Sequence, residues 1–529
     1  MRSLLIRLFL ALLAALPPAA LAASLRWATQ ADIQTLDPHA QNDLLTNSLS
    51  AHVHERLTAR DERLTIVPAL ATGWRQLGPR RWRFELRPGV RFHGGEPFTA
   101  DDVVFSVERA QHPNSAISHY ARALGRVSAS GPHAVEFTLE RFNPVFLDHL
   151  DAVFIMSRAW AASHGLLTPP RRGDAKASAG ATAANGTGPF QLVERVPDAR
   201  TVLRRRADHW AGPQGGNVEQ LIHLPVASAA ARSAGLLSGE LDLVTDPAPA
   251  DIARLAQGAR FRIARVVENR VYFLGFKQNL DRLASNPALA GNPLRDPRVR
   301  QAIALAIDTQ ALSARLLQGN AVPARCLMPA ASACDAVMPP LPMRAPDREQ
   351  ARALMAQAGY PRGFALTFHC PQPFEPSCQA ITVMLAKIGI RAQLVPEPLA
   401  TFYARLHRRE TDFYFLGWGG AESDPQPTLD PLMHSPNGIT GQGQVNYGGI
   451  EDAALDALID AAAREEDPAA RRRLLDQAIT RHETRLYHVP LYRPTLSWAM
   501  RRGVTAEPLP NGRLRAWAVK VENPGFRSP

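Results

Sequence analysis

The feature that most constrains the fold of this chain is an alternation of strand and helix patterns in its second half. Apolar strands are predicted at Ala365–His369, Arg391–Val395 and Asp412–Leu416, with helices at Gln379–Ile388 and Thr401–His407 between them. Strands separated by helices in this way are typical of βαβ units, whose strands run parallel. The sequence therefore predicts a mixed α/β domain with strands that are largely parallel.

The last of these strands leads into a stretch that reads DFYFLGWGGAESDP. Its aromatic and apolar start suits a buried strand, which we expect to break at Gly417. Because ligands of open α/β sheets bind beyond the carboxyl ends of strands, the stretch is predicted to form the floor of a binding pocket. The alternative is an ordinary glycine-rich turn with a half-buried indole. The candidate ligand-binding residues here are Trp418, Gly419, Gly420, Ala421, Glu422 and Asp424.

The first 22 residues have the order of a secretory signal peptide. A charged start with Arg2 and Arg7 precedes an apolar run and small residues that end at Ala22. The apolar run is too short to span a bilayer, so we expect export to the periplasm and cleavage after about Ala22. The first cysteine is Cys326, which excludes a lipoprotein signal.

The length and the charge of the chain limit its domain number and its partners. About 500 mature residues exceed what one hydrophobic core supports, so two or three domains are expected. The formal net charge is +11, and the arginines that carry it are spread along the whole chain. A nucleic-acid surface would gather basic residues together with stacking aromatics. We therefore expect no nucleic-acid partner.

The four cysteines form two local pairs, Cys326 with Cys334 and Cys370 with Cys378. In an oxidising compartment, local pairing is the simplest of the three possible connectivities. Metal binding would require closer spacing and nearby histidines. Two structural disulfides are predicted, each worth roughly 2–3 kcal/mol in the chain-entropy model.

Six separated segments carry short motifs in a fixed order. They read LDP at Leu36–Pro38, GVRFHGGEPFTADDVVFSVER at Gly89–Arg109, GTGPF at Gly186–Phe190, DHWAG at Asp208–Gly212, DPRVRQA within Asp296–Asp308, and NY at Asn446–Tyr447. Together they resemble the family 5 extracellular solute-binding proteins, the peptide- and nickel-type receptors of ABC importers. The resemblance covers essentially the whole mature chain, and the second segment is its most specific part.

The resemblance implies a periplasmic binding protein-like α/β fold, with two lobes, a hinge and an extra α/β domain inserted in the first lobe. Lobe I is expected at 24–52, 187–266 and 490–529, the inserted domain at 53–186, and lobe II at 267–489. The implied ligand is a small solute or short peptide. The implied partners are an inner-membrane ABC permease and its ATPase subunits, since the chain itself lacks a P-loop motif. We expect a monomer without cofactor or metal.

One position departs from the pattern of the peptide-binding members. In those members an aspartate three residues after the tryptophan pairs with the ligand's terminal ammonium, and that position here is Ala421. A buried ammonium without a carboxylate partner is costly. Either Glu422 substitutes for the missing acid, or the ligand is a non-peptide such as a nickel chelate, an opine, glutathione or a sugar.

Further residues are candidates for ligand contact, each with a structural alternative. Tyr272 begins the strand that enters lobe II, and Tyr492 lies where the chain returns to lobe I. Arg405 suits a ligand carboxylate but also a solvated helix face. Asp37 belongs to a loop at the family's cleft but equally suits a turn before Pro38.

An exported hydrolase is the alternative from another functional class. The sequence lacks both G-x-S-x-G and H-E-x-x-H, which are the motifs of a nucleophile elbow and a zinc protease. No catalytic residue is therefore predicted.

Overall fold

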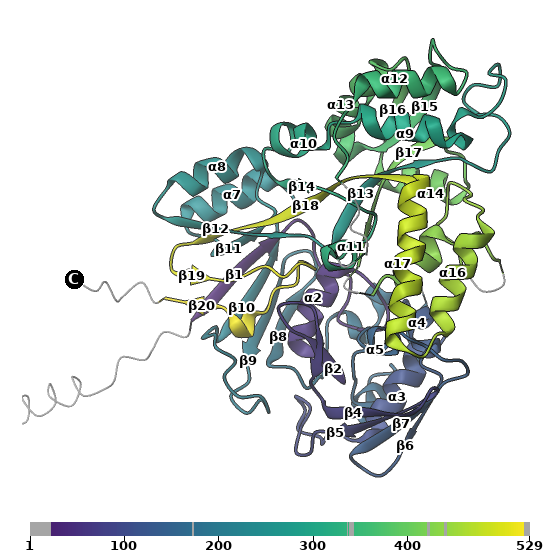
Figure 1. The fold of residues 1–529 in the computed structure, drawn as a ribbon. Helices are drawn as coiled ribbons and strands as arrows, with labels where there is room; N and C mark the ends of the chain where they lie inside the picture. Colours follow the sequence, from purple (N-terminus) through teal and green to yellow (C-terminus); the bar gives the residue numbers. More distant parts are fainter. Residues whose placement is uncertain are drawn as a thin grey trace, which may run out of the picture.

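The computed structural model describes residues 23–171, 174–335, 337, 343–420, 424–438 and 442–522. The predicted signal peptide and the calls on Ala421 and Glu422 lie outside the described residues. One large mixed sheet runs through the two α/β bodies in the upper part of Figure 1, and a smaller sheet lies at the bottom.

The left part of the large sheet contains both N-terminal and C-terminal segments. The central strand β1 runs parallel to β10 and β11, whereas β9 is antiparallel to both β10 and β8. The elements are β1 (Ser24–Thr29), α2 (Leu44–Val53), β8 (Phe190–Val196), β9 (Arg200–Arg205), β10 (Gln220–Pro225), α7 (Ala229–Ser238), β11 (Leu243–Thr245) and α8 (Pro249–Gln257). The short strands β19 (Val504–Thr505) and β20 (Lys520–Val521) pair with each other in a separate sheet.

The right part of the large sheet contains the alternating segments. β15 (Ala365–Pro371) runs parallel to β16 (Arg391–Glu397) and to β17 (Phe413–Gly419). However, β17 is antiparallel to β13 (Arg270–Phe276). The prediction of largely parallel strands therefore holds only for β15–β17, because β13 enters from the other lobe instead of through a βαβ crossover.

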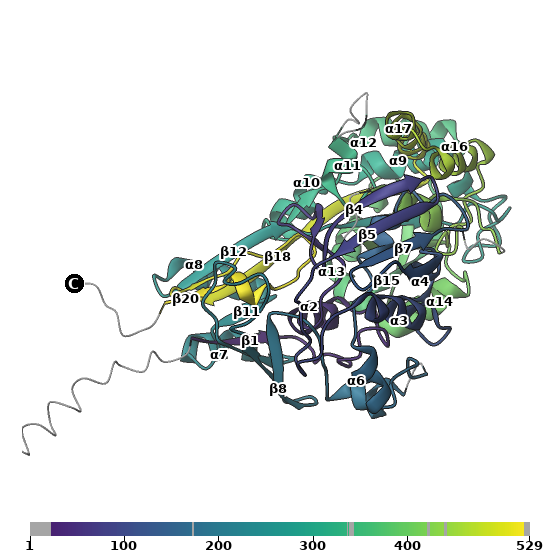
Figure 2. The ribbon, with the colours of Figure 1, turned by 90° about the horizontal axis from the view of Figure 1, so that it is seen from below.

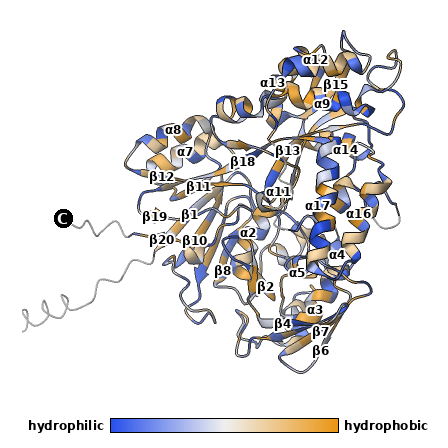
Figure 3. Ribbon diagram, in the orientation of Figure 1, coloured by the Kyte–Doolittle hydropathy of each residue, from blue (hydrophilic) through white to orange (hydrophobic). Residues whose placement is uncertain are grey.

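Helices surround this part of the sheet. Figure 3 shows hydrophobic residues gathered along the strands, whereas α17 carries many hydrophilic residues. The helices are α9 (Pro297–Ala306), α10 (Thr309–Ala311), α11 (Ala331–Asp335), α12 (Arg348–Gln357), α13 (Glu375–Ala386), α14 (Leu399–His407), α15 (Gln426–Thr428), α16 (Ala453–Arg464) and α17 (Pro468–Arg485).

Two segments carry the chain between the lobes. β12 (Phe261–Val267) and β13 are separated by Glu268 and Asn269 alone. The long strand β18 (His488–Arg501) pairs with β13 and β14 (Ala321–Pro323) in its first half, and with β11 and β12 in its second half. The boundaries expected at 266/267 and 489/490 both fall on these crossing strands.

The region 53–186 has a sheet and an apolar core of its own. Its antiparallel sheet has the order β4-β5-β7-β6, and Figure 2 shows this sheet from below. Phe84, Phe92, Phe98, Phe137 and Phe146 are fully buried between the sheet and its helices. The elements are β2 (Thr58–Arg60), β3 (Ile66–Pro68), β4 (Ala71–Gly78), β5 (Arg81–Leu86), α3 (Ala100–Gln111), α4 (Ser118–Arg122), β6 (Arg126–Ala129), β7 (Ala134–Thr138), α5 (Phe146–Leu150) and α6 (Arg158–Ser163).

The end of this region differs from the surface linker that its small residues predict. Gly180 and Ala181 are buried, and the Leu36 amide donates a hydrogen bond to the Gly180 carbonyl. A Cβ on Gly180 would lie 2.8 Å from the Cβ of Asp37. The small side chains therefore permit close packing against another loop.

Both predicted disulfides are present with local pairing. Cys326 is bonded to Cys334, with 6.0 Å between the Cα atoms, and Cys370 to Cys378, with 6.5 Å. The second bond ties the end of β15 to α13.

Asp452 joins α16 to α17 and to the start of β18. It caps α16 through its carboxylate, receives two hydrogen bonds from Arg481, and accepts another from the Tyr487 hydroxyl. Burial opposes ionisation of Asp452, but the hydrogen bonds from Arg481 and Tyr487 outweigh it and lower its pKa to about 2. The carboxylate thus stabilises the folded state, fully so above its unfolded pKa.

We expect this stabilisation to be lost as the pH falls from about 4, the ordinary range of an aspartate, towards 2. Asp452→Asn should therefore be less stable than the wild type at neutral pH, and the difference should shrink as the solution is acidified. Urea unfolding at a series of pH values measures this difference. A difference that stays constant down to pH 2 contradicts the assignment.

Candidate functional site: the cleft at the end of strand β17

Strand β17 continues to Gly419, so the predicted break at Gly417 is wrong. Gly417 lies opposite Tyr272 in the ladder, and a Cβ at Gly417 would lie 2.6 Å from the Tyr272 ring. The position requires glycine because the Tyr272 ring leaves no room for a Cβ. Gly417 is therefore a residue of the strand interior and not its end. The ladder carries Trp418 and Gly419 to the edge of the cleft.

Three neighbouring cavities lie around the end of β17. One of about 310 Å³ is lined by Trp418, Gly419, Gly420 and Asp424 on one side and by residues of α4 and α5 on the other. A second of about 200 Å³ shares Gly419 and Gly420 with the first. A groove of about 710 Å³ shares Asp424 with the first and extends along β4, β5 and α17. Together they form a cleft between the region 53–186 and lobe II, which we call the interdomain cleft.

Trp418 and Asp424 are fixed by neighbours at the wall of this cleft. The Trp418 indole Nε1 donates to Thr428 Oγ1 over 3.1 Å, and the ring is half-buried. Arg471 binds both oxygens of Asp424 at 2.6 and 2.9 Å, and the Gln426 amide donates to Oδ1. The Asp424 charge is therefore already paired within the protein.

Tyr272 and Tyr492 lie in the lobe II core. Their rings are 5.3 Å apart, and Tyr272 stacks on Phe415. The Tyr492 hydroxyl is hydrogen-bonded to Ser377, and burial raises the Tyr492 pKa to about 12. Neither tyrosine lines the three cavities.

Arg405 lies on α14 and lines none of the three cavities. Its Nε donates to Glu397 over 2.8 Å, and the other oxygen of Glu397 contacts His369 at 3.0 Å. This ion pair places Arg405 against β16, where its charge is already compensated.

Asp37 is completely buried beneath its loop. Arg109 donates to both carboxylate oxygens, at 2.9 and 2.6 Å, and both side chains are 0% exposed. Arg109 also donates to His39 Nδ1, while His39 Nε2 donates to the Phe154 carbonyl. Burial and the adjacent Arg109 lower the His39 pKa to about 3, so the ring is neutral. Asp37 therefore joins its loop to α3, as its turn position also suggests.

Comparison with known proteins places these features in a family. Residues 65–439 match the model of the bacterial extracellular solute-binding proteins, family 5. The chain belongs to this family. It is 28% identical over 464 residues to Di/tripeptide-binding protein 3 of Pseudomonas aeruginosa, covering 81% of this chain and 82% of that one. It is also 28% identical over 464 residues to Heme-binding protein A of Haemophilus influenzae, covering 82% and 80%.

The solved structures confirm the fold. The structure of HbpA2 from Haemophilus parasuis matches with a TM-score of 0.78 and 26% identity, over 94% of this chain and 100% of that one. The family 5 resemblance and the periplasmic binding protein-like α/β fold are thus both confirmed. Within the described residues, no helix is long and apolar enough to cross a membrane.

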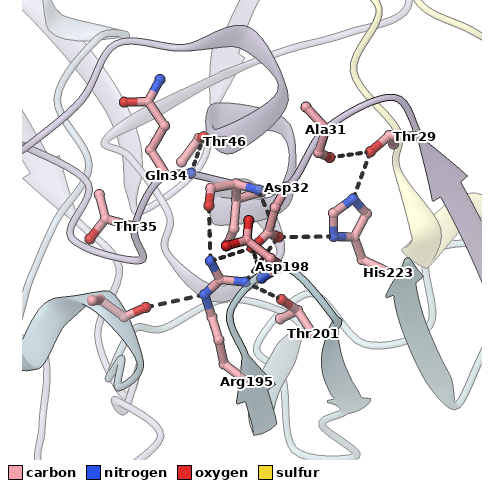
Figure 4. A network of polar contacts seen from close by, with 12 residues as sticks. Thr29, Ala31, Asp32, Gln34, Thr35, Thr46, Arg195, Asp198, Thr201 and His223 are labelled. Carbon is pink, nitrogen blue, oxygen red and sulfur yellow. Dashed lines mark hydrogen bonds and ion pairs between the residues drawn. The ribbon is translucent and has the colours of Figure 1, made fainter. Parts of the chain in front are cut away.

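A polar network fixes the loop that follows β1 in this family 5 protein (Figure 4). Arg195 binds both oxygens of Asp32 at 3.1 and 3.0 Å, and the Asp198 amide donates to Asp32 over 2.7 Å. Burial opposes ionisation of Asp32, but these hydrogen bonds outweigh it and lower its pKa. The network holds the loop that leads to Asp37 against β8 and β9.

Several residues of the interdomain cleft were not predicted from sequence. His119, Tyr120 and His149 face the end of β17 from α4 and α5, and Arg56 and Asn511 line the smaller cavity. They are far apart in the chain and belong to no recognisable motif. Among the described residues, no group of three or more His, Cys, Asp or Glu side chains could hold a metal ion.

Proposed function

We propose that this family 5 protein is a periplasmic receptor that captures a short peptide or peptide-like solute and delivers it to an inner-membrane ABC permease. The observation that carries the proposal is the interdomain cleft, where Trp418 and the bare backbone of Gly419 and Gly420 face α4 and α5. An indole wall beside glycine backbone suits a ligand that offers both apolar groups and amides. The di/tripeptide-binding relative supports this ligand class.

The two crossing segments support the proposed working cycle. Lobe closure is an equilibrium between two states that a ligand biases through contacts made only in the closed one. Glu268 and Asn269, which separate β12 from β13, are the short connection at which the lobes would rotate. The permease with its ATPase subunits would then recognise the closed receptor. In this proposal the chain acts as a monomer without catalysis, and its signal peptide is cleaved after about Ala22.

A second candidate function is the same receptor activity towards a non-peptide solute. Ala421 supports it, because the peptide-binding members have an acid there. A heme-binding protein among the relatives also supports it, because that protein's name states a non-peptide ligand. Under the first candidate, Glu422 supplies the missing acid.

The protein purified from its own periplasm should carry a ligand that native mass spectrometry detects. A ladder of peptide masses is the result expected of a peptide receptor, and a single non-peptide mass favours the second candidate. Under the second candidate, unmodified di- to pentapeptides should shift the melting temperature of the emptied protein only slightly, whereas a peptide receptor should be stabilised by them. Ala421→Asp should then strengthen amine-dependent binding by about tenfold or more, the effect of one hydrogen bond to a charged group.

Acetylated peptides are the control, because they lack the ammonium and should bind Ala421→Asp no better than the wild type. Glu422→Gln should weaken peptide binding if Glu422 supplies the missing acid. Tight binding of free-amine peptides that neither Glu422→Gln nor Asp424→Asn changes would contradict the pocket proposed here.

A further inference from the structure

The smaller cavity of the interdomain cleft lies where the three parts of the molecule meet. Its volume is about 200 Å³, which suits one functional group better than a whole ligand. It is bounded by Arg56 and Arg60 from the start of the region 53–186, by Glu268–Arg270 from the lobe connection, and by Gly419 and Gly420 from β17. Asn511 and Arg513 close it from the C-terminal segment.

Arg56 is the unusual residue of this cavity. It is only 8% exposed, its guanidinium lies 3.6 Å from the centre of the Phe154 ring, and its Nε has no hydrogen-bond partner. It forms no ion pair with any carboxylate that the structure describes. Burial, reinforced by the nearby Arg513, lowers the Arg56 pKa to about 9. A buried cation without a partner is costly, and an anion beside it would offset that cost.

The acids of the cavity are already occupied by other arginines. Arg60 binds Asp148 at 2.7 Å and Asp151 at 2.8 Å. Arg270 binds Glu268 at 2.9 Å. The second oxygen of Asp151, Oδ1, has no hydrogen-bond partner and repels an anion. Arg56 is the arginine of this cavity that forms no described ion pair, although the charges of Asp151 and Arg60 are close enough to act on it.

Asn511 supplies a second donor to the same cavity. It is 6% exposed, and its Oδ1 accepts a hydrogen bond from the Arg513 backbone amide over 3.3 Å. This bond fixes the orientation of the Asn511 side-chain amide. Its other polar atom, the donor Nδ2, has no hydrogen-bond partner. Arg56 and Asn511, from distant parts of the chain, thus both line this cavity, and both also line a neighbouring cavity of about 350 Å³.

We propose that this cavity is a subsite for a carboxylate of the bound solute, which Arg56 and Asn511 receive together. A carboxylate is small, planar and accepts several hydrogen bonds, which matches a guanidinium and an amide donor around a small space. The carboxylate would belong to the solute of the proposed receptor function, so this inference rests on that function for its ligand. The anion site itself can be tested without knowing the solute.

The first test uses the emptied protein and simple anions. Thermal unfolding is followed in sodium chloride with increasing sodium glutarate at constant ionic strength, for the wild type and for Arg56→Gln. The wild-type melting temperature should rise saturably with glutarate, whereas Arg56→Gln should show no such rise. Arg87→Gln is the matched control, because Arg87 also stacks on an aromatic ring, 4.0 Å from the centre of Trp210, but lines none of the cleft cavities.

Three results overturn the proposal, two of them from this test and one from the same test repeated with inorganic phosphate. One is a wild-type melting temperature that glutarate does not raise. Another is an equal rise in the wild type and in Arg56→Gln. A rise with inorganic phosphate but not with glutarate also overturns it, because it would assign the cavity to a tetrahedral anion.

The second test separates the subsite from the receptor function. Peptides that bind the wild type are compared with their C-terminal amides by calorimetry. Amidation and Arg56→Gln should each weaken binding at least tenfold. Their effects should not add when both changes are combined, because each removes the same contact. If neither amidation nor Arg56→Gln weakens peptide binding, the carboxylate subsite is contradicted but the receptor function is not. If glutarate binds saturably through Arg56 but no peptide binds, the peptide proposal is contradicted and the carboxylate subsite is supported.

Discussion

Arg109→Leu is expected to lower the free energy of unfolding by about 3–5 kcal/mol, the usual effect of breaking a buried ion pair. Arg109 and Asp37 are both 0% exposed, and Arg109 binds both oxygens of the carboxylate. The substitution leaves the Asp37 carboxylate buried without its cation, and it removes the donor to His39. Urea unfolding of the purified protein measures the loss.

The double variant Asp37→Asn/Arg109→Leu separates the pair from its surroundings. It should lose less stability than the sum of the two single variants, because the uncompensated charge is absent. Arg254→Leu is the exposed control. Its pair with Asp251 lies on the surface of α8, where an ion pair contributes at most about 1 kcal/mol. Equal losses for Arg109→Leu and Arg254→Leu contradict the assigned role.

Gly186→Ala is expected to cost about 3 kcal/mol or more, because the site has no room for a methyl group. An added Cβ would lie 1.9 Å from the Val53 carbonyl oxygen and 2.9 Å from His54 Nδ1. The nearest atom belongs to the backbone at the end of α2, so it cannot move aside as a flexible side chain would. We expect a lower melting temperature and a smaller yield of folded protein.

Gly73→Ala is the matched control, because a Cβ at Gly73 in β4 would meet no heavy atom within 4 Å. It should leave stability unchanged or slightly improved. If Gly186→Ala is as stable as Gly73→Ala, the prediction is wrong. The backbone near Val53 would then move aside for the methyl group at little cost.

The sequence predicted most where local pattern and structure coincide. The strands predicted at Ala365–His369 and Arg391–Val395 are present as β15 and β16. The helices predicted at Gln379–Ile388 and Thr401–His407 are present as α13 and α14. Both disulfides are local pairs, so their partners could be predicted from spacing alone.

The remaining features depend on contacts between distant residues. In the sequence, Gly417 resembles the end of a strand. In the structure it lies inside β17, where the ring of Tyr272, 145 positions away in the chain, packs against it. Asp37 has the chemistry of a ligand contact, and only the fold shows that Arg109 neutralises it. Arg56 and Asn511 line the same cavity but are 455 positions apart in the chain, so no window of sequence could pair them.

The shared strand β18 also bears on how the molecule is made. β18 forms ladders with β13 and β14 in one lobe and with β11 and β12 in the other, yet it begins only at His488. During synthesis, neither lobe can close its sheet until nearly the whole polypeptide has left the ribosome. The sheets of both lobes are therefore completed late in synthesis. One late strand, followed in the chain by the short strands β19 and β20, thus couples the completion of the two lobes.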